Sequence, residues 1–148
     1  INKLKKEVKM DLILQLKQEH VQIIYLLEEI LNETKKTEKN SKLIPNLREL
    51  KLVLISHLKL EDNLLYPVFE KAKDAKMNEL GKSFSEEMLA ISKVALKFFA
   101  DFEKEEVSKL IGDQNFKTQL QGIIKVVKKR VSIEEKILFP AYQNNLVA

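Results

Sequence analysis

The sequence predicts an all-α protein, an antiparallel four-helix bundle with up-down-up-down topology. Apolar residues recur at helical spacing in four long segments of the 148-residue chain. Gly and Pro number three each, fewer than a protein built of strands and tight turns needs. Short connections between long helices favour antiparallel neighbours. We expect residues 1–148 to form a single domain, because this length supports one sizeable core but not two.

The first predicted helix runs from about Asp11, a residue suited to the N-cap, to Thr34, and the polar residues 35–42 form the loop that follows. Its apolar face carries Ile13, Leu16, His20, Ile23, Ile24, Leu27 and Ile30. The second helix opens at Pro45 and extends to about Asp74, with a kink or an early end expected at Pro67. Its inner face carries Leu50, Val53, Leu54, His57, Leu60, Glu61, Leu64, Leu65 and Val68.

Gly81 and Ser83 precede the third predicted helix, in which Ser83 and Glu86 have the spacing of a capping box. We expect this helix to end near Gly112 and to turn inward Phe84, Met88, Ile91, Ala95, Phe98 and Phe102. Asp113 is placed to cap the fourth helix. The apolar face of the fourth helix carries Leu120, Ile123, Val127, Arg130, Glu134, Ile137 and Leu138.

An internal repeat relates the two halves of the chain. Residues 57–67 align without gaps with residues 130–140, and both stretches share the pattern Glu, acid, two variable positions, Leu, aromatic, Pro. The first and third helices match more weakly, with Glu19-His20 falling on Glu87-Met88. The repeat predicts two helical hairpins related by an approximate twofold axis, with equivalent positions facing each other at the bundle centre.

Four polar residues are predicted to meet at that centre. His57 and Glu61 are four residues apart and share one helix face, Glu134 is the repeat equivalent of Glu61, and His20 lies on the apolar face of the first helix. A buried carboxylate needs a partner. A lone inward His is more often a hydrogen-bonded core residue, and a lone inward Glu more often belongs to an ion pair. Together, however, two imidazoles and two carboxylates favour a shared divalent metal.

These residues resemble the hemerythrin-like, or HHE cation-binding, domain family over nearly the whole chain. Domains of that family carry a His on the first helix, His-x-x-x-Glu on the second, a His on the third and His-x-x-x-Glu on the fourth. Four ligand positions are matched, by His20, His57, Glu61 and Glu134. The resemblance implies a bundle in which the two glutamates bridge two irons. It also implies a domain that binds or senses dioxygen, iron or reactive small molecules.

The sequence departs from the family pattern at two ligand positions. Met88 stands where the third-helix His belongs, and Arg130 stands where the fourth-helix His belongs. By the twofold logic both missing ligands serve the same metal, so we expect one ion, iron first, with manganese or zinc also compatible. Arg130 would take the place of the second metal and pair with Glu134, Glu61 or both, while Met88 fills the remaining space. A surface Arg130–Glu134 pair is the weaker alternative, because apolar residues flank Arg130.

The leading functional hypothesis is a metal-binding module that senses dioxygen, redox state or iron, with a coordination position open for a small ligand. The alternative is a metal-free helical scaffold for protein contacts, in which Arg130 neutralises the glutamates. A di-metal enzyme would need further ligands such as Glu86, Glu87 or Glu135, which lie beside the inward face. No nucleophile–base arrangement or phosphate-binding loop accompanies them, so we expect no enzyme.

Other classes of function find little support in the sequence. No apolar run approaches the ~20 residues of a membrane span, so we expect no membrane partner. Lys128, Lys129 and Arg130 form a basic cluster, but no recognition motif or interleaved aromatic accompanies it, so we expect no nucleic-acid partner. The chain has no Cys, which fits a reducing compartment, and we expect a cytoplasmic location.

Overall fold

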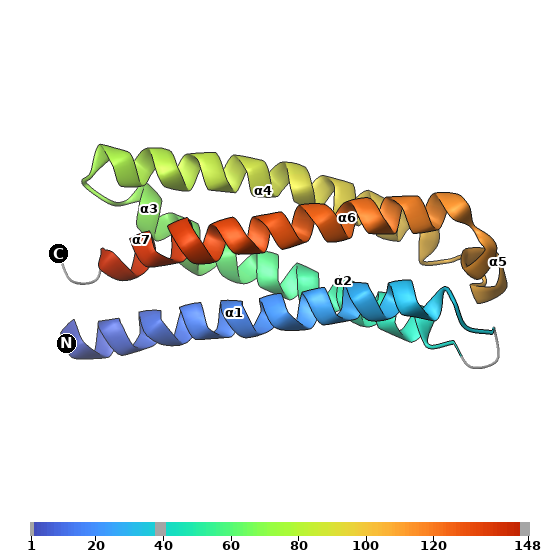
Figure 1. Cartoon of the computed structure of the whole chain (residues 1–148). Coiled ribbons are helices and arrows are strands. Elements are labelled where there is room, and N and C mark those ends of the chain that lie inside the picture. Colours follow the sequence, from blue (N-terminus) through green and yellow to red (C-terminus); the bar gives the residue numbers. More distant parts are fainter. Residues whose placement is uncertain (1, 38–40, 146–148) are drawn as a thin grey trace.

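The computed structural model describes residues 2–37 and 41–145, and four long helical segments run side by side there (Figure 1). The first is α1 (Asn2–Glu33), and the third is α4 (Ala75–Phe102). The second joins α2 (Leu43–Leu60), the π-helical turn η2 (Glu61–Leu65) and α3 (Tyr66–Glu70). After the short α5 (Val107–Gly112), the fourth joins α6 (Gln114–Ile133), η3 (Glu134–Leu138) and α7 (Phe139–Asn144). Successive segments run in opposite directions, which confirms the predicted all-α bundle.

Two clusters of buried apolar side chains fill the bundle. One joins α1, α2, α4, α5 and α6, and its members include Leu27, Leu50, Phe98, Phe102 and Phe116. The other lies toward the opposite end, and its members include Leu16, Leu65, Phe69, Leu138 and Phe139. The polar residues singled out in the sequence fall between the two clusters on the first, second and fourth segments, so apolar layers cover them on both sides.

The second and fourth segments each contain a π-helical turn at the same point of the repeat. The Tyr66 N–H donates to the carbonyl of Glu61, and the Phe139 N–H donates to that of Glu134, five residues earlier in both cases. Pro67 and Pro140 follow at once. Proline has no N–H and its ring clashes with the carbonyl four residues earlier in a regular α-helix, a clash that the wider turn relieves. The break expected at Pro67 is therefore a π turn in a continuing helix.

The wider turns change which side chains face inward. Tyr66 and Phe139 are buried, whereas Leu64 and Ile137 are 52% and 49% exposed. The prediction that Leu64 and Ile137 belong to the inner face is therefore wrong. It assumed a regular α-helical period, and the wider π turn rotates Leu64 and Ile137 outward and brings the aromatic residue two positions later inward.

Two helix starts also differ from those predicted. The first helix begins at Asn2 rather than Asp11, and the second at Leu43 rather than Pro45. Residues 2–10 contain no Gly or Pro and are rich in strong helix formers. Their high helix propensity explains why the first helix already begins on the N-terminal side of Asp11. Pro45 sits in the first turn of α2, where its missing N–H has no helical partner to lose.

The third helix is displaced from its predicted bounds. It begins at Ala75, where the Asp74 side chain caps it by accepting a hydrogen bond from the Lys76 N–H at 2.9 Å. Ser83 is therefore inside the helix and not its cap. The helix ends at Phe102, and α5 is a separate short helix that ends at Gly112. For the fourth helix the prediction is confirmed, because the Asp113 carboxylate accepts from two N–H groups of its first turn.

Gly81 lies inside α4, not ahead of it, and it is buried. Its backbone conformation is one that any residue adopts. Space is what requires a glycine here, because a Cβ at this position would collide with the Phe69 side chain. Gly81 thus allows α3 and α4 to approach closely at the turn between the second and third segments.

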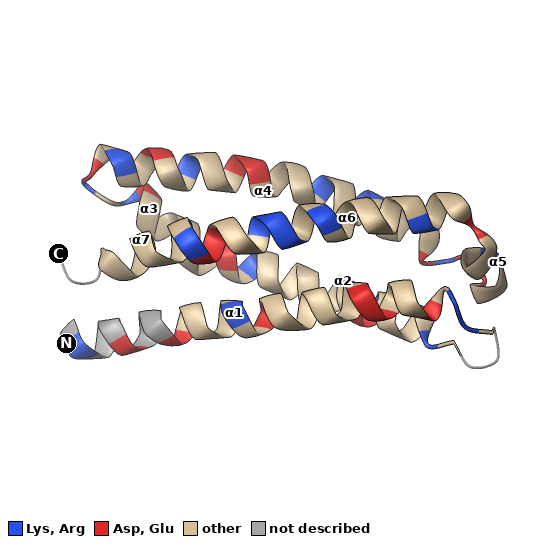
Figure 2. Ribbon diagram, viewed as in Figure 1, with Lys and Arg blue, Asp and Glu red and all other residues tan. Residues whose placement is uncertain are grey.

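Acidic and basic residues are interspersed along the visible helices, as in a solvated surface (Figure 2). Among the described residues, no helix combines the length and the hydrophobicity that crossing a lipid bilayer requires.

Because α3 and α4 approach closely at Gly81, we expect replacement of this glycine by alanine to destabilise the protein, although alanine favours helices. Alanine is normally better than glycine inside a helix by about 0.5–1 kcal/mol. Gly81→Ala should instead lower the free energy of unfolding by about 1–3 kcal/mol, because the new methyl group overpacks against Phe69. Urea denaturation measures the change. In the matched variant Gly122→Ala, nothing lies within 4 Å of the new Cβ, and stability should rise. Equal effects at both sites would contradict the packing described.

Candidate metal centre

Five polar side chains that the sequence placed inward are buried between the two apolar clusters. Each is at most 4% exposed, and the five are His20, His57, Glu61, Arg130 and Glu134. They come from three of the four segments: α1, the α2–η2 junction and the α6–η3 junction. Met88, from α4, completes the set and is 8% exposed. All six residues are therefore brought to the same level of the bundle.

Two imidazoles and a carboxylate converge at this level. His20, His57 and Glu134 each offer one ligand atom, and these atoms lie within 4.8 Å of one another. The two imidazole ring centroids are 4.8 Å apart. Each Nε2 atom faces a carboxylate: His20 Nε2 is 3.0 Å from Glu134 Oε1, and His57 Nε2 is 3.2 Å from Glu61 Oε1. The second contact is close without hydrogen-bond geometry, so Glu61 Oε1 gains no donor from it.

A second pair of carboxylates holds the outer nitrogens of the two rings. His57 Nδ1 donates to Glu19 Oε1 at 2.8 Å, and His20 Nδ1 donates to Glu135 Oε2 at 2.9 Å. The Phe139 ring also stacks on His20 at 5.5 Å. Carboxylates in this position commonly orient metal-binding imidazoles and make them more basic. The hydrogen bonds to Nδ1 leave the Nε2 atoms directed at the shared centre.

Sequence reasoning missed the roles of Glu19, Glu135 and Tyr66. The sequence predicts Glu135 only as a replacement ligand beside the inward face, whereas in the structure its carboxylate pairs with His20. The repeat carried a usable indication, because an acidic residue follows Glu61 and Glu134 in both halves and an aromatic residue follows five positions after each.

Arg130 occupies the other side of the centre. Its Nε donates to Glu134 Oε2 at 2.6 Å, and its Nη2 donates to Tyr66 Oη at 3.1 Å and to the Phe84 carbonyl at 2.8 Å. Tyr66 Oη in turn donates to Glu61 Oε2 at 3.5 Å. The buried Arg130–Glu134 pair predicted from the sequence is thus present, and the surface pair is not. Arg130 reaches Glu61 only through Tyr66.

The pairing around Arg130 repeats that around His57. In the first half, His57 pairs with Glu19 on the preceding helix of its own hairpin; in the second half, Arg130 Nη1 lies 3.8 Å from Glu87 Oε1. Glu19 and Glu87 are equivalent positions of the repeat. The approximate twofold symmetry is therefore retained in the second half, with a guanidinium in place of an imidazole.

The two buried glutamates differ in their pKa shifts. Burial opposes ionisation of Glu134, but the hydrogen bond with His20 and the charge of Arg130 outweigh it, so the pKa of Glu134 is lowered. Burial and the nearby Glu134 charge raise the pKa of Glu61, and His57 and Arg130 offset this only in part. Glu134 is therefore the carboxylate whose charge the protein already compensates, and Glu61 is the one left needing a cation.

The two groups beside Glu61, the His57 imidazole and the Tyr66 hydroxyl, both carry protons. Burial acts to lower the pKa of His57, but the hydrogen bond with Glu19 and the contact with Glu61 raise that pKa to about 10. Burial raises the pKa of the Tyr66 hydroxyl well above its usual range, so Tyr66 remains a neutral hydrogen-bond donor. Without a metal ion, a proton on His57 would supply the positive charge beside Glu61.

The donor set on the His57 side fits a metal ion, and the set on the Arg130 side does not. Within the described part of the chain, Glu61 Oε1 is buried with no hydrogen-bond donor, so it is free to coordinate. Two imidazoles and two carboxylates suit a divalent first-row ion. On the other side stand a thioether and a guanidinium that cannot lose its proton. These residues fit one ion rather than two.

The buried ion pair predicts a large loss of stability when Arg130 is removed. Arg130→Ala would leave the Glu134 carboxylate buried without its cation and should cost about 3–5 kcal/mol in chelator-treated protein, measured by urea denaturation. Lys129→Ala changes the exposed neighbouring residue and should stay within about 0.5 kcal/mol of the unmodified chain. A comparable small effect for both variants would show that Arg130 is not the required counter-charge.

Comparison with known protein families agrees with this geometry. The family model described as the hemerythrin HHE cation binding domain matches residues 11–142, which include all of the residues described at the centre. Comparisons with curated proteins and with solved structures gave no match. The match covers most of the chain, and the structure is a helical bundle with a buried His–Glu cluster. This chain therefore belongs to the hemerythrin HHE cation-binding domain family.

Proposed function

We propose that the chain binds one metal ion, iron in the first place, through His20, His57, Glu61 and Glu134, and that it acts as a sensor or binding module rather than an enzyme. One observation carries the proposal. Two imidazole nitrogens and a carboxylate oxygen converge within 4.8 Å in the bundle interior, next to a buried carboxylate with an uncommitted oxygen. Membership of a cation-binding family supports metal binding of some kind.

The residues around the proposed ion would hold and shield it. Glu19 and Glu135 keep the imidazoles oriented, and the apolar clusters on both sides limit access of water. An iron ion held there would supply a redox-active Lewis acid with room for a small ligand. Because Arg130 occupies the second half of the centre, a reaction that shares two electrons between two ions has no second ion here. Binding or sensing of dioxygen, redox state or iron is the use that this arrangement favours.

Metal stoichiometry tests the proposal. Protein purified without chelator and reconstituted anaerobically with Fe(II) should contain one ion per chain by mass spectrometry of the metal. His57→Ala should reduce this value several-fold. Met88→His combined with Arg130→His restores both missing imidazoles and should raise it toward two, because Glu61 and Glu134 are already in place.

Each single histidine substitution serves as the control for the double variant, since one added imidazole does not complete the second ligand set. Two ions in the unmodified chain would overturn the assignment of Arg130 as a substitute for a metal. No ion in any reconstituted sample, with iron, manganese or zinc, would overturn metal binding itself.

A metal-free scaffold for protein contacts is the second candidate, and the Arg130 network favours it. The guanidinium pairs directly with Glu134 and, through Tyr66, reaches Glu61, while each imidazole has a carboxylate at both ring nitrogens. A largely satisfied polar network of this kind is tolerated in a core without a metal.

Thermal unfolding separates the two candidates. An ion that binds only the folded chain adds about 2.7 kcal/mol at a free concentration of 100 Kd, so Fe(II) should raise the melting temperature by several degrees if the metal proposal holds. His57→Ala should remove that increase. A melting temperature that does not respond to iron, manganese or zinc would favour the scaffold.

A further inference from the structure

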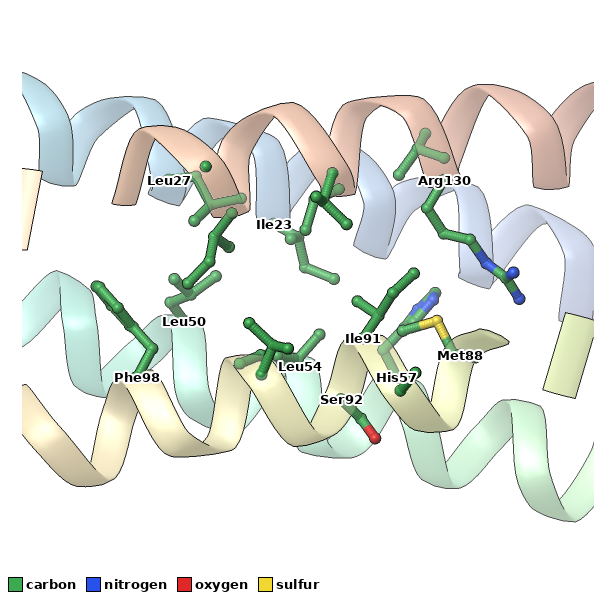
Figure 3. Close-up of a pocket in the computed structure, with 18 of the residues that line it drawn as sticks. Ile23, Leu27, Leu50, Leu54, His57, Met88, Ile91, Ser92, Phe98 and Arg130 are labelled. Carbon is green, nitrogen blue, oxygen red and sulfur yellow. The ribbon is translucent and has the colours of Figure 1, made fainter. Parts of the chain in front are cut away.

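A cavity of about 460 Å³ extends from the polar centre into the apolar cluster of the bundle (Figure 3). Cavities of roughly 300–1,000 Å³ are typical of small-molecule sites. In Figure 3, His57, Met88 and Arg130 gather at one end of the cavity, and Leu27, Leu50 and Phe98 lie at the other. The cavity therefore joins the candidate metal centre to a chamber whose walls are mostly apolar.

The cavity is long and runs along the helices. Its walls on α4 extend from Met88 to Phe99, and the eleven steps between these residues correspond to about 16 Å at 1.5 Å per helical residue. All four long segments contribute aliphatic or aromatic side chains to the wall, among them Ile23, Leu54, Ile91, Ala95 and Ile123. This shape suits an extended chain better than a compact ring system.

Most polar groups that border the cavity are already engaged, and the exception among the described residues is Arg130 Nη1, which is buried without a hydrogen-bond partner. Both Glu134 oxygens are paired, with His20 and with Arg130, and the Ser92 hydroxyl donates to the Leu89 carbonyl. Figure 3 shows the Ser92 hydroxyl and the Arg130 guanidinium directed away from the cavity. A ligand would therefore meet almost no free hydrogen-bonding group or charge along the wall. A charged molecule would lose its hydration there without compensation.

An opening to the surface lies between α4 and α6. Four of the residues that line the cavity are exposed, namely Ala90 and Val94 on α4 and Gly122 and Val126 on α6. All four are small or apolar, and Val94 and Val126 are 62% and 47% exposed. Small apolar residues at this gap leave an entrance that an aliphatic chain can pass.

We propose that this cavity binds a linear, uncharged aliphatic molecule, which enters between α4 and α6 and places one end beside His20 and His57. The proposal goes beyond metal binding and does not depend on it, because only His20, His57 and Glu134 at the inner end of the cavity belong to the candidate metal centre, and the rest of the wall is built from side chains that no ion would contact. Burial of the chain against the apolar walls supplies the affinity.

Displacement of a fluorescent dye tests the proposal. N-phenyl-1-naphthylamine, an uncharged dye that brightens in apolar surroundings, is bound to the 148-residue chain and displaced with 1-decanol, with decanoate or with cyclodecanol. Linear 1-decanol should displace the dye at concentrations about tenfold lower than those needed for the charged or the cyclic compound. Equal potency of all three compounds, or no dye binding, would overturn the proposal.

Two matched pairs of variants locate the site. Ala95→Phe fills the cavity, whereas Ala100→Phe adds the same group to the exposed side of α4. Gly122→Phe obstructs the opening, whereas Gly112→Phe adds the same group at a glycine that also has open space but lies away from the cavity. The first variant of each pair should weaken 1-decanol binding about tenfold or more, and the second should not. The glycine pair keeps the test valid if Ala95→Phe fails to fold.

The inner end of the cavity has a direct reporter, because His20 and His57 are the only histidines of the chain. In chelator-treated protein, saturating 1-decanol should shift the imidazole NMR signals of both residues. Displacement of the dye with both imidazole signals unmoved would place the aliphatic molecule elsewhere and overturn the proposal. The same titration can succeed in a chain that binds no iron, so failure of the metal proposal and failure of this one are distinguishable.

Discussion

Two carboxylates, Glu61 and Glu134, are buried in the middle of a mostly apolar bundle, and compensation of their charge is the constraint on which the other features of the centre depend. An uncompensated carboxylate in such surroundings costs several kcal/mol. The charge of Glu134 is compensated by the Arg130 guanidinium, whose Nε lies at 2.6 Å, and by His20, whose Nε2 lies at 3.0 Å. At Glu61 it offers only a long hydrogen bond from Tyr66 and the neighbouring His57. The centre is therefore asymmetric, although the fold that carries it is nearly symmetric.

This asymmetry agrees with replacement of one metal by an arginine. A guanidinium is a permanent cation of fixed charge, so the half of the centre that contains Arg130 does not depend on metal supply. The half that contains His20, His57 and Glu61 retains imidazoles, whose charge can be exchanged for that of an ion. The proposed single exchangeable cation beside a permanent one suits the proposed binding or sensing role better than chemistry that needs two ions.

The sequence predicted the fold class and the inward positions of the polar residues, because both depend on helical periodicity and on the internal repeat. It did not predict the π turns, since nothing in an α-helical pattern distinguishes Leu64 from an inward residue until the turn at Glu61 widens. For the same reason the sequence did not predict the role of Tyr66, because the π turn is what places its hydroxyl in contact with Glu61 and Arg130. The start of α4 is capped by Asp74, a local signal that the sequence carries and that the prediction passed over. The contact of Gly81 with Phe69, which explains a glycine inside the helix, is tertiary and cannot be read from local propensity.

The contacts of Glu19 and Glu135 with the two imidazoles could not be predicted from the sequence either, because they join different helices.

The central claim is that the centre uses two cations, an exchangeable metal ion and the permanent Arg130 guanidinium. A crystal structure with anomalous diffraction recorded at the iron edge measures this most directly. The account predicts one anomalous peak, bounded by His20, His57 and the glutamates, and none between Met88 and Arg130. Two peaks, or an Arg130 side chain displaced from Glu134 by a second ion, would contradict it.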